Sequence, residues 1–173
     1  MTLNLTRPAG PPGGGVDDLY REHAIAMVRL AVLLTGDQAT AEDVVQDAFI
    51  GLYKGWARLR DQDKAVGYLR TAVINGCRSV HRSRRRVWLP GRPPHDSPVW
   101  SAEAAVIDSE ERRSVLAAVA RLPRRQREIL ALRYYLDLPD SEIAAMLKIS
   151  RGTVSSTASR AVAALTRQLQ ERQ

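Results

Sequence analysis

The residues best suited to recognising a ligand lie near the end of the chain, where short polar side chains and an arginine recur at helical spacing. One side of a candidate helix starting at Arg151 is apolar, with Val154, Ala158, Ala161, Leu165 and Leu169 three or four positions apart. The opposite side carries Ser155, Ser156, Ser159 and Arg160. Hydroxyl groups and a guanidinium suit the base edges of a DNA groove, so this face is a candidate DNA reader. The alternative is an ordinary amphipathic helical hairpin with a solvated face.

The preceding residues would position this helix as the second half of a helix-turn-helix. Asp140 or Ser141 is expected to cap a short helix that runs to Leu147. Ile149 and Ser150 then form a tight corner into the reading helix.

Composition favours a helical protein with a polyanionic partner. The chain has 173 residues, 45% of them apolar and only 5% aromatic, so Leu, Val, Ile and Ala must supply the core. Its 26 basic residues exceed its 19 acidic residues, giving a net charge of +7. This excess of positive charge fits binding to nucleic acid, although a GC-rich genome, whose codons favour arginine, would produce the same excess.

The chain carries no pattern typical of catalysis, of a cofactor or of a metal site. Cys77 is the only cysteine, which excludes an internal disulfide and fits a reducing cytoplasm. His23, His81 and His95 are scattered, and no glycine loop for phosphate or serine nucleophile motif is present. With no export signal and no apolar run of about 18 residues, we expect a cytoplasmic protein that is neither an enzyme nor bound to a membrane.

Periodicity predicts an all-α fold of two small helical domains joined by a linker rich in Pro and Arg. Residues 1–15 are a Pro- and Gly-rich tail, and residues 16–86 hold helices at about 16–34, 40–56 and 66–81. The linker is 87–100, and residues 101–173 hold helices at about 101–121 and 124–135 before the helix-turn-helix. The apolar side of the second helix is expected to include Tyr53 and Trp56.

Two charged features of the N-terminal domain suggest different partners. Six arginines and no acid lie between Arg78 and Arg92, which predicts salt-sensitive binding to phosphates. In contrast, the second helix carries Asp43, Gln46 and Asp47 on its polar side. That acidic face would repel DNA, and it is either solvated or a docking surface for a basic protein partner.

The order of its motifs makes the chain resemble the sigma-70 family of bacterial RNA polymerase sigma factors. Within that family it is most similar to the extracytoplasmic-function group and to its sigma-E-like branch. The resemblance covers almost everything from Val16 to Leu169. It rests on the order and spacing of LYREH at 19–23, AEDVVQDAF at 41–49, YLRTAVIN at 68–75, LPRRQR at 122–127, SEIA at 141–144 and GTV at 152–154.

The resemblance implies a subunit that binds core polymerase and directs promoter-specific initiation. Residues 16–86 would be region 2, which binds core polymerase and melts the minus-10 element, and residues 101–173 would be region 4, which reads the minus-35 element. Contacts to the clamp helices of the beta-prime subunit fall on Asp43, Gln46 and Asp47. Minus-10 contacts fall on Arg60, Asp61, Lys64, Tyr68, Asn75, Arg78, Arg82 and Arg85. Minus-35 contacts fall on Ser141, Arg151, Gly152, Thr153, Ser155, Ser156, Ser159 and Arg160.

The chain departs from the family's usual pattern at a few positions, and other functions compete with this one. Ser155 and Thr157 stand where relatives often carry Lys or Arg, and Tyr68 stands where Trp is common. An anti-sigma factor is a further partner that the family often uses. The first alternative is a free-standing helix-turn-helix regulator of the LuxR type, which would bind duplex DNA without polymerase. The second is an interaction module whose basic surface docks an acidic protein.

Overall fold

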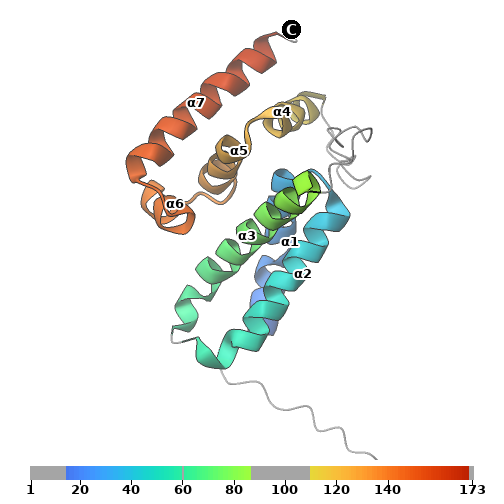
Figure 1. Cartoon of the computed structure of the whole chain (residues 1–173), viewed down its shortest axis with the longest axis vertical. Helices are drawn as coiled ribbons and strands as arrows, with labels where there is room; N and C mark the ends of the chain where they lie inside the picture. Colours follow the sequence, from blue (N-terminus) through green and yellow to red (C-terminus); the bar gives the residue numbers. More distant parts are fainter. Residues whose placement is uncertain (1–14, 60, 87–109, 172–173) are drawn as a thin grey trace, which may run out of the picture.

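In a computed structural model that describes residues 15–59, 61–86 and 110–171, every regular element is helical (Figure 1). The predicted all-α class is therefore confirmed, as are two helical regions, one on each side of residues 87–109. The linker and the predicted helix start near Ser101 lie outside the described residues, as does the tail up to residue 14. No helix within the described ranges combines the length and the apolar character needed to cross a bilayer.

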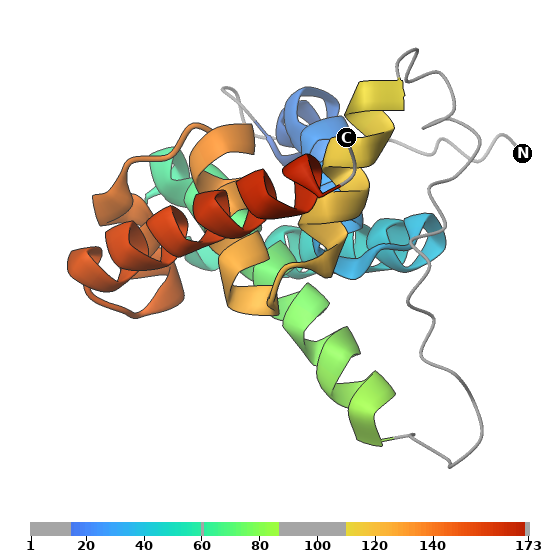
Figure 2. The same ribbon diagram turned by 90° about the horizontal axis from the view of Figure 1, so that it is seen from above.

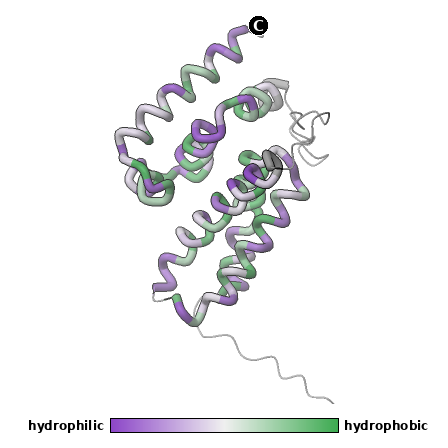
Figure 3. The backbone as a smooth tube through the Cα atoms, in the orientation of Figure 1, coloured by the Kyte–Doolittle hydropathy of each residue, from purple (hydrophilic) through white to green (hydrophobic). Residues whose placement is uncertain are grey.

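Three long helices build the N-terminal region: α1 (Val16–Thr35), α2 (Gln38–Gly55) and α3 (Ala65–Arg86). The short 3-10 helices η1 (Trp56–Arg58) and η2 (Gln62–Lys64) connect α2 to α3. The three helices pack against one another pairwise. Each is amphipathic, so hydrophobic and hydrophilic residues alternate along the tube in Figure 3.

The N-terminal helices begin and end at residues that the apolar pattern identifies only approximately. Gly36 closes α1 in the left-handed conformation (φ 75°), and Asp37 caps α2 by accepting a 2.8 Å hydrogen bond from the Thr40 backbone N–H. The predicted start at Thr40 was therefore two residues late. At the other end, α3 continues beyond the predicted His81 to Arg86, so the first part of the arginine run is helical.

The C-terminal region contains α4 (Glu110–Arg121), α5 (Arg124–Leu130), the π-helical segment η4 (Ala131–Tyr135), α6 (Asp140–Leu147) and α7 (Arg151–Gln170). The last two form the predicted helix-turn-helix. Lys148 turns the chain in the left-handed conformation (φ 55°, ψ 51°), and the Ser150 hydroxyl caps α7 at the Thr153 N–H, 3.1 Å away.

Two sequence-based expectations about side chains were wrong. Neither Asp140 nor Ser141 caps α6, because Pro139 occupies the N-cap position and the Asp140 carboxylate pairs with Arg133 at 3.4 Å. Tyr53 was assigned to the apolar side of α2 but is 70% exposed. The inward positions of that helix are already filled by Phe49 and Leu52, which are both buried.

Most buried apolar residues of the two regions form one continuous cluster. It joins Met27 and Leu30 of α1 to Ile129 of α5 and Leu132 of η4. Helix α1 is the main bridge, since it contacts α4, α5 and η4 as well as α2 and α3. Seen from above, α4 lies beside α1 (Figure 2). The described parts of the chain are therefore packed in a closed arrangement.

Helix α2 packs tightly against α3 at Gly76, and this contact gives a stability prediction. A Cβ atom on Gly76 would lie 2.7 Å from Val44 Cγ1, whereas one on Gly67 of the same helix would meet nothing within 4 Å. Val44 is buried and β-branched, so it has little freedom to move aside. We expect Gly76→Ala to lower the free energy of unfolding by about 1–3 kcal/mol. Gly67→Ala, the matched control, should raise it by up to about 1 kcal/mol. Urea denaturation followed by circular dichroism measures both, and equal effects would contradict the close contact.

Candidate nucleic-acid interface

The predicted reading face of α7 is exposed along its whole length. Val154, Ala158 and Ala161 point into the core, with 1% or less of each residue accessible. The polar residues on the other side are all exposed: Arg151, Gly152, Thr153, Ser155, Ser156, Ser159 and Arg160. Ser141, in the first turn of α6, is exposed as well. The structure thus brings every predicted minus-35 residue to the surface of one helix-turn-helix.

Hydrogen bonds within α7 hold several of these polar groups. Ser159 donates to the Ser155 carbonyl oxygen at 3.0 Å, and Arg160 donates through Nε to the Ser156 carbonyl oxygen at 3.2 Å. A hydroxyl that donates to its own helix keeps lone pairs that accept from a base amine. Thr157, noted for its departure from the family pattern, is 7% exposed and therefore lies outside the reading face.

Four of the predicted minus-10 residues are exposed on η2 and α3. Tyr68, Asn75 and Arg82 are seven residues apart, a spacing that aligns them along one side of α3. Tyr68 is 52% exposed, so its ring is accessible for stacking on a base. Lys64 forms a 2.9 Å ion pair with Asp61, and its hydrogen bond lowers the pKa of the Asp61 carboxyl. Arg60 and the side chain of Arg85 lie outside the described residues.

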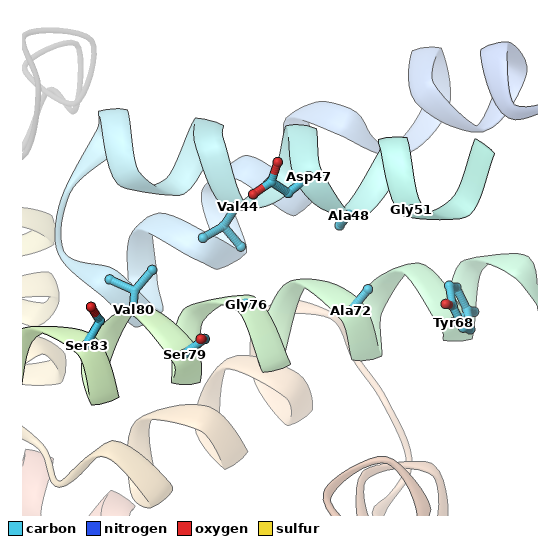
Figure 4. Close-up of a pocket in the computed structure, with 10 residues that line it drawn as sticks. All are labelled: Val44, Asp47, Ala48, Gly51, Tyr68, Ala72, Gly76, Ser79, Val80 and Ser83. Atoms are coloured by element: carbon cyan, nitrogen blue, oxygen red, sulfur yellow. The ribbon is translucent and has the colours of Figure 1, made fainter. Parts of the chain in front are cut away.

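An open groove of about 480 Å³ lies between α2 and α3 (Figure 4). Asp47, Ala48 and Gly51 line its α2 side, and Tyr68 and Ser79 belong to its α3 side. The groove therefore connects the acidic face of α2 to the predicted minus-10 surface of α3.

The acidic face of α2 is a mixed polar and apolar stripe. Asp43, Gln46 and Asp47 are all exposed, as the sequence predicts for a docking face. Ile50 and Tyr53 continue the same side of the helix one and two turns farther on, and they are 43% and 70% exposed. Sequence reasoning placed Tyr53 on the apolar side because it follows Phe49 by one helical turn, and it did not consider Ile50.

Arg78 is the predicted DNA contact that the structure places differently from its neighbours. Its guanidinium forms a bidentate ion pair with Glu128 of α5, through Nε to Oε1 at 2.9 Å and through NH2 to Oε2 at 2.8 Å. The Arg78 side chain is 20% exposed and that of Glu128 only 2%. This contact joins α3 of the first region to α5 of the second.

Three arginines compensate the buried charge of Glu128. Arg125 lies 3.1 Å and Arg124 3.5 Å from its carboxylate oxygens, in addition to Arg78. Burial alone would raise the pKa of Glu128, but the hydrogen bonds and charges of the arginines outweigh burial and lower the pKa. Glu128 is therefore ionised at neutral pH.

Burial, reinforced by the charge of Glu128, raises the pKa of Cys77 to about 12, so the thiol is protonated and unsuited to nucleophilic chemistry.

Further polar contacts cross between the two regions near the end of α1. Arg127 donates to the Leu34 carbonyl oxygen at 3.2 Å, and His81 lies 2.9 Å from the same oxygen. The Tyr135 hydroxyl donates to the Ala26 carbonyl oxygen at 3.4 Å. Sequence reasoning missed Glu128 and Arg127, because neither interrupts the helical pattern and their partners are distant in sequence.

Two family models match the chain in order. Residues 19–87 match "Sigma-70 region 2" and residues 112–165 match "Sigma-70, region 4". The first match holds α2, α3 and almost all of α1, and the second holds α6, most of α7 and Glu128. A free-standing LuxR-type regulator does not account for the region 2 match, and that alternative is not supported.

Curated relatives and solved structures agree with these matches. The RNA polymerase sigma-E factor of Streptomyces coelicolor is 31% identical over 153 residues, which cover 88% of this chain and 85% of the relative. The ECF RNA polymerase sigma factor SigL of Mycobacterium tuberculosis is 34% identical over 155 residues, 88% of each chain.

The fold is similar to that of two solved complexes, each with a TM-score of 0.68. One is RpoE with the anti-sigma factor NepR from Bartonella quintana, at 22% identity and covering 89% of this chain and 98% of that one. The other is CnrH with the cytosolic domain of CnrY, at 23% identity and covering 91% and 89%. With both regions matched in order and relatives above 30% identity over most of their length, the chain belongs to the sigma-70 family, in its extracytoplasmic-function (ECF) group.

Proposed function

We propose that this protein acts in the cytoplasm as a promoter-specificity subunit of RNA polymerase, with no chemistry of its own. The observation that carries the proposal is the presence, on one chain, of sigma-70 regions 2 and 4 with most of their predicted contact residues exposed. Residues 16–86 bind core polymerase and the minus-10 element, and residues 101–173 read the minus-35 element. Residues 87–100 connect these two domains, and residues 1–15 form a tail.

The stripe on α2 is the proposed surface for core polymerase. Asp43 and Asp47 supply negative charge in a protein of net charge +7, and such a local reversal of sign favours a basic partner over DNA. Ile50 and Tyr53 add apolar area next to those charges. The clamp helices of the beta-prime subunit are the proposed partner for this stripe.

The exposed side of α3 is the proposed minus-10 surface, and the exposed side of α7 is the proposed minus-35 reader. Tyr68 provides a stacking surface, and Asn75 and Arg82 provide donors on the same side of α3. Opening a duplex costs unstacking energy, which stacking on an aromatic ring partly returns. On α7, the serine hydroxyls provide acceptors and Arg160 provides donors for recognition of base edges in the major groove.

An anti-sigma factor is a further proposed partner. Both of the solved structures described above contain a second protein: the anti-sigma factor NepR in one and the cytosolic domain of CnrY in the other. This support comes from the likeness in fold alone.

Reconstitution with core RNA polymerase tests the proposal directly. The full chain is mixed with core enzyme, the complex is isolated by gel filtration, and start sites are mapped by transcription of genomic fragments in vitro. A stable complex and discrete new start sites are expected. Folded protein that neither binds core enzyme nor changes its start sites would refute the proposal.

The α2 stripe predicts a charge-reversal effect on polymerase binding. Asp43→Arg together with Asp47→Arg places like charges against a basic partner, so affinity for core enzyme should fall by at least about tenfold. Glu22→Arg changes an exposed acid of α1 and serves as the control. Fluorescence anisotropy of labelled protein titrated with core enzyme measures the affinity, and equal losses in both variants would exclude a specific role for the stripe.

The exposed ring of Tyr68 predicts a defect in promoter opening. Tyr68→Ala removes a stacking surface worth roughly 1–3 kcal/mol, so open complexes should decrease about 5- to 150-fold. Tyr68→Phe keeps the ring and should retain most activity. Permanganate footprinting of the holoenzyme on a mapped promoter measures opening, and a defect of similar size in Tyr68→Phe would rule out stacking as the cause.

The α7 face predicts that Arg160 reads sequence. Arg160→Ala should weaken holoenzyme binding to a promoter with its minus-35 element about 5- to 150-fold, the range of one good base contact. The same variant should bind a promoter with a scrambled minus-35 element as wild type does. Thr166→Ala, farther along the exposed side of α7, is the control. Equal losses on the two promoters would show that Arg160 contacts only the backbone.

A further inference from the structure

One predicted promoter contact is already occupied by a group of the protein itself. Arg78 lies on the edge of the α3 surface that carries Asn75 and Arg82, but its guanidinium is bound by Glu128 of region 4. Asn75 and Arg82 remain exposed. The closed arrangement therefore blocks a specific part of the minus-10 surface.

The Glu128 carboxylate presents to Arg78 the same chemistry as a DNA phosphate. Both are anions with two oxygens that accept a parallel pair of N–H donors from guanidinium, and the distances of 2.9 and 2.8 Å are those of a strong charge-assisted pair. One guanidinium cannot offer its Nε and NH2 edge to both anions at once. Binding of Glu128 and binding of phosphate at that edge are mutually exclusive.

The closed arrangement also cannot span a promoter. Minus-10 and minus-35 elements are centred about 25 base pairs apart, which is ~85 Å of duplex at 3.4 Å per base pair. Arg78 binds α5, α5 contacts α7, and the 20 residues of α7 extend ~30 Å. Every part of α7 is thus within roughly 50 Å of Arg78. Regions 2 and 4 must separate before both elements are bound.

We propose that Glu128 is an intramolecular competitor of promoter DNA, which holds Arg78 in the free protein and releases it when core polymerase separates region 4 from region 2. This inference rests on the proposed function and adds a regulatory role for a residue outside the predicted contact faces. Free protein is closed and binds DNA weakly, and holoenzyme is open with Arg78 available.

The neighbours of Glu128 make this contact reversible. Arg124 and Arg125 belong to the same helix as Glu128 and stay beside it when the regions part. Opening therefore leaves no carboxylate without a cation, which would otherwise be strongly unfavourable. Arg78, released on the other side, is free to bind a phosphate.

The test compares the size and DNA affinity of wild-type protein and Glu128→Gln, which keeps the side-chain shape but removes its charge. Small-angle X-ray scattering of free protein measures the radius of gyration, which should increase in the variant. Anisotropy with a fluorescein-labelled single-stranded DNA of 20 mixed nucleotides measures affinity. If the open form is a minor species in wild type, affinity should rise about tenfold or more.

Three further variants isolate the contact. Arg78→Lys keeps the charge but loses the bidentate fork, so it should also open the protein without disturbing buried Glu128. Adding Arg78→Ala to Glu128→Gln should abolish the gain in DNA affinity. Glu142→Gln removes an exposed carboxylate of α6 and should behave as wild type. Circular dichroism confirms that each variant is folded.

The outcomes separate this inference from the proposed function. Unchanged size and unchanged DNA affinity in both Glu128→Gln and Arg78→Lys would overturn it. An increase in size without a gain in DNA affinity would overturn the competition, because Arg78 would then be free but not used. In holoenzyme, Glu128→Gln should transcribe as wild type does, since the regions are already apart. Failure of wild-type protein to bind core enzyme would instead refute the proposed function.

Discussion

The arrangement of the two regions depends on how the charge of one glutamate is compensated. Glu128 is 2% exposed, and an isolated carboxylate at such a site would cost several kcal/mol. Arg124 and Arg125 approach it from its own helix, and Arg78 completes the set from α3. Because the third cation comes from region 2, the most favourable environment for Glu128 exists only when the regions are in contact. The ion pair thereby sets the position of α5 against α1 and α3, and the apolar cluster continues across that boundary.

This closure affects the candidate contact faces unequally. The α2 stripe and the α7 face remain exposed in the closed arrangement, so both could meet a partner first. Of the predicted minus-10 residues whose side chains the structure describes, Arg78 is the one bound by the other region. A partner that engages α2 and α7 together could thus pull the regions apart before the minus-10 surface is complete. The order of binding would then follow from which side chains are accessible.

Local patterns in the sequence predicted most of the helices but not how the regions meet. Apolar spacing identified α7 and its exposed face, since spacing along one helix suffices to place Val154 and Ala161 on the same side, opposite the polar residues. The same reasoning failed for Tyr53, because periodicity cannot show that Phe49 and Leu52 already fill the available space. It could not find the Arg78–Glu128 pair, whose members are 50 residues apart. Contacts of that kind depend on tertiary packing, which leaves no trace in the spacing of either helix.

The polar contacts between the regions explain why DNA and polymerase could replace them. Arg127 donates to the Leu34 carbonyl at the C-terminal end of α1, where carbonyls lack helical partners and the helix dipole is negative. Water can satisfy that carbonyl after opening, and phosphate can satisfy Arg78. The apolar cluster that crosses the same boundary has no such replacement in water or phosphate, so opening also requires an apolar surface of the partner in exchange. The arginines at this boundary instead bind the phosphates of a promoter. The side chains that hold the free protein closed are therefore chemically suited to hold DNA once the protein is open.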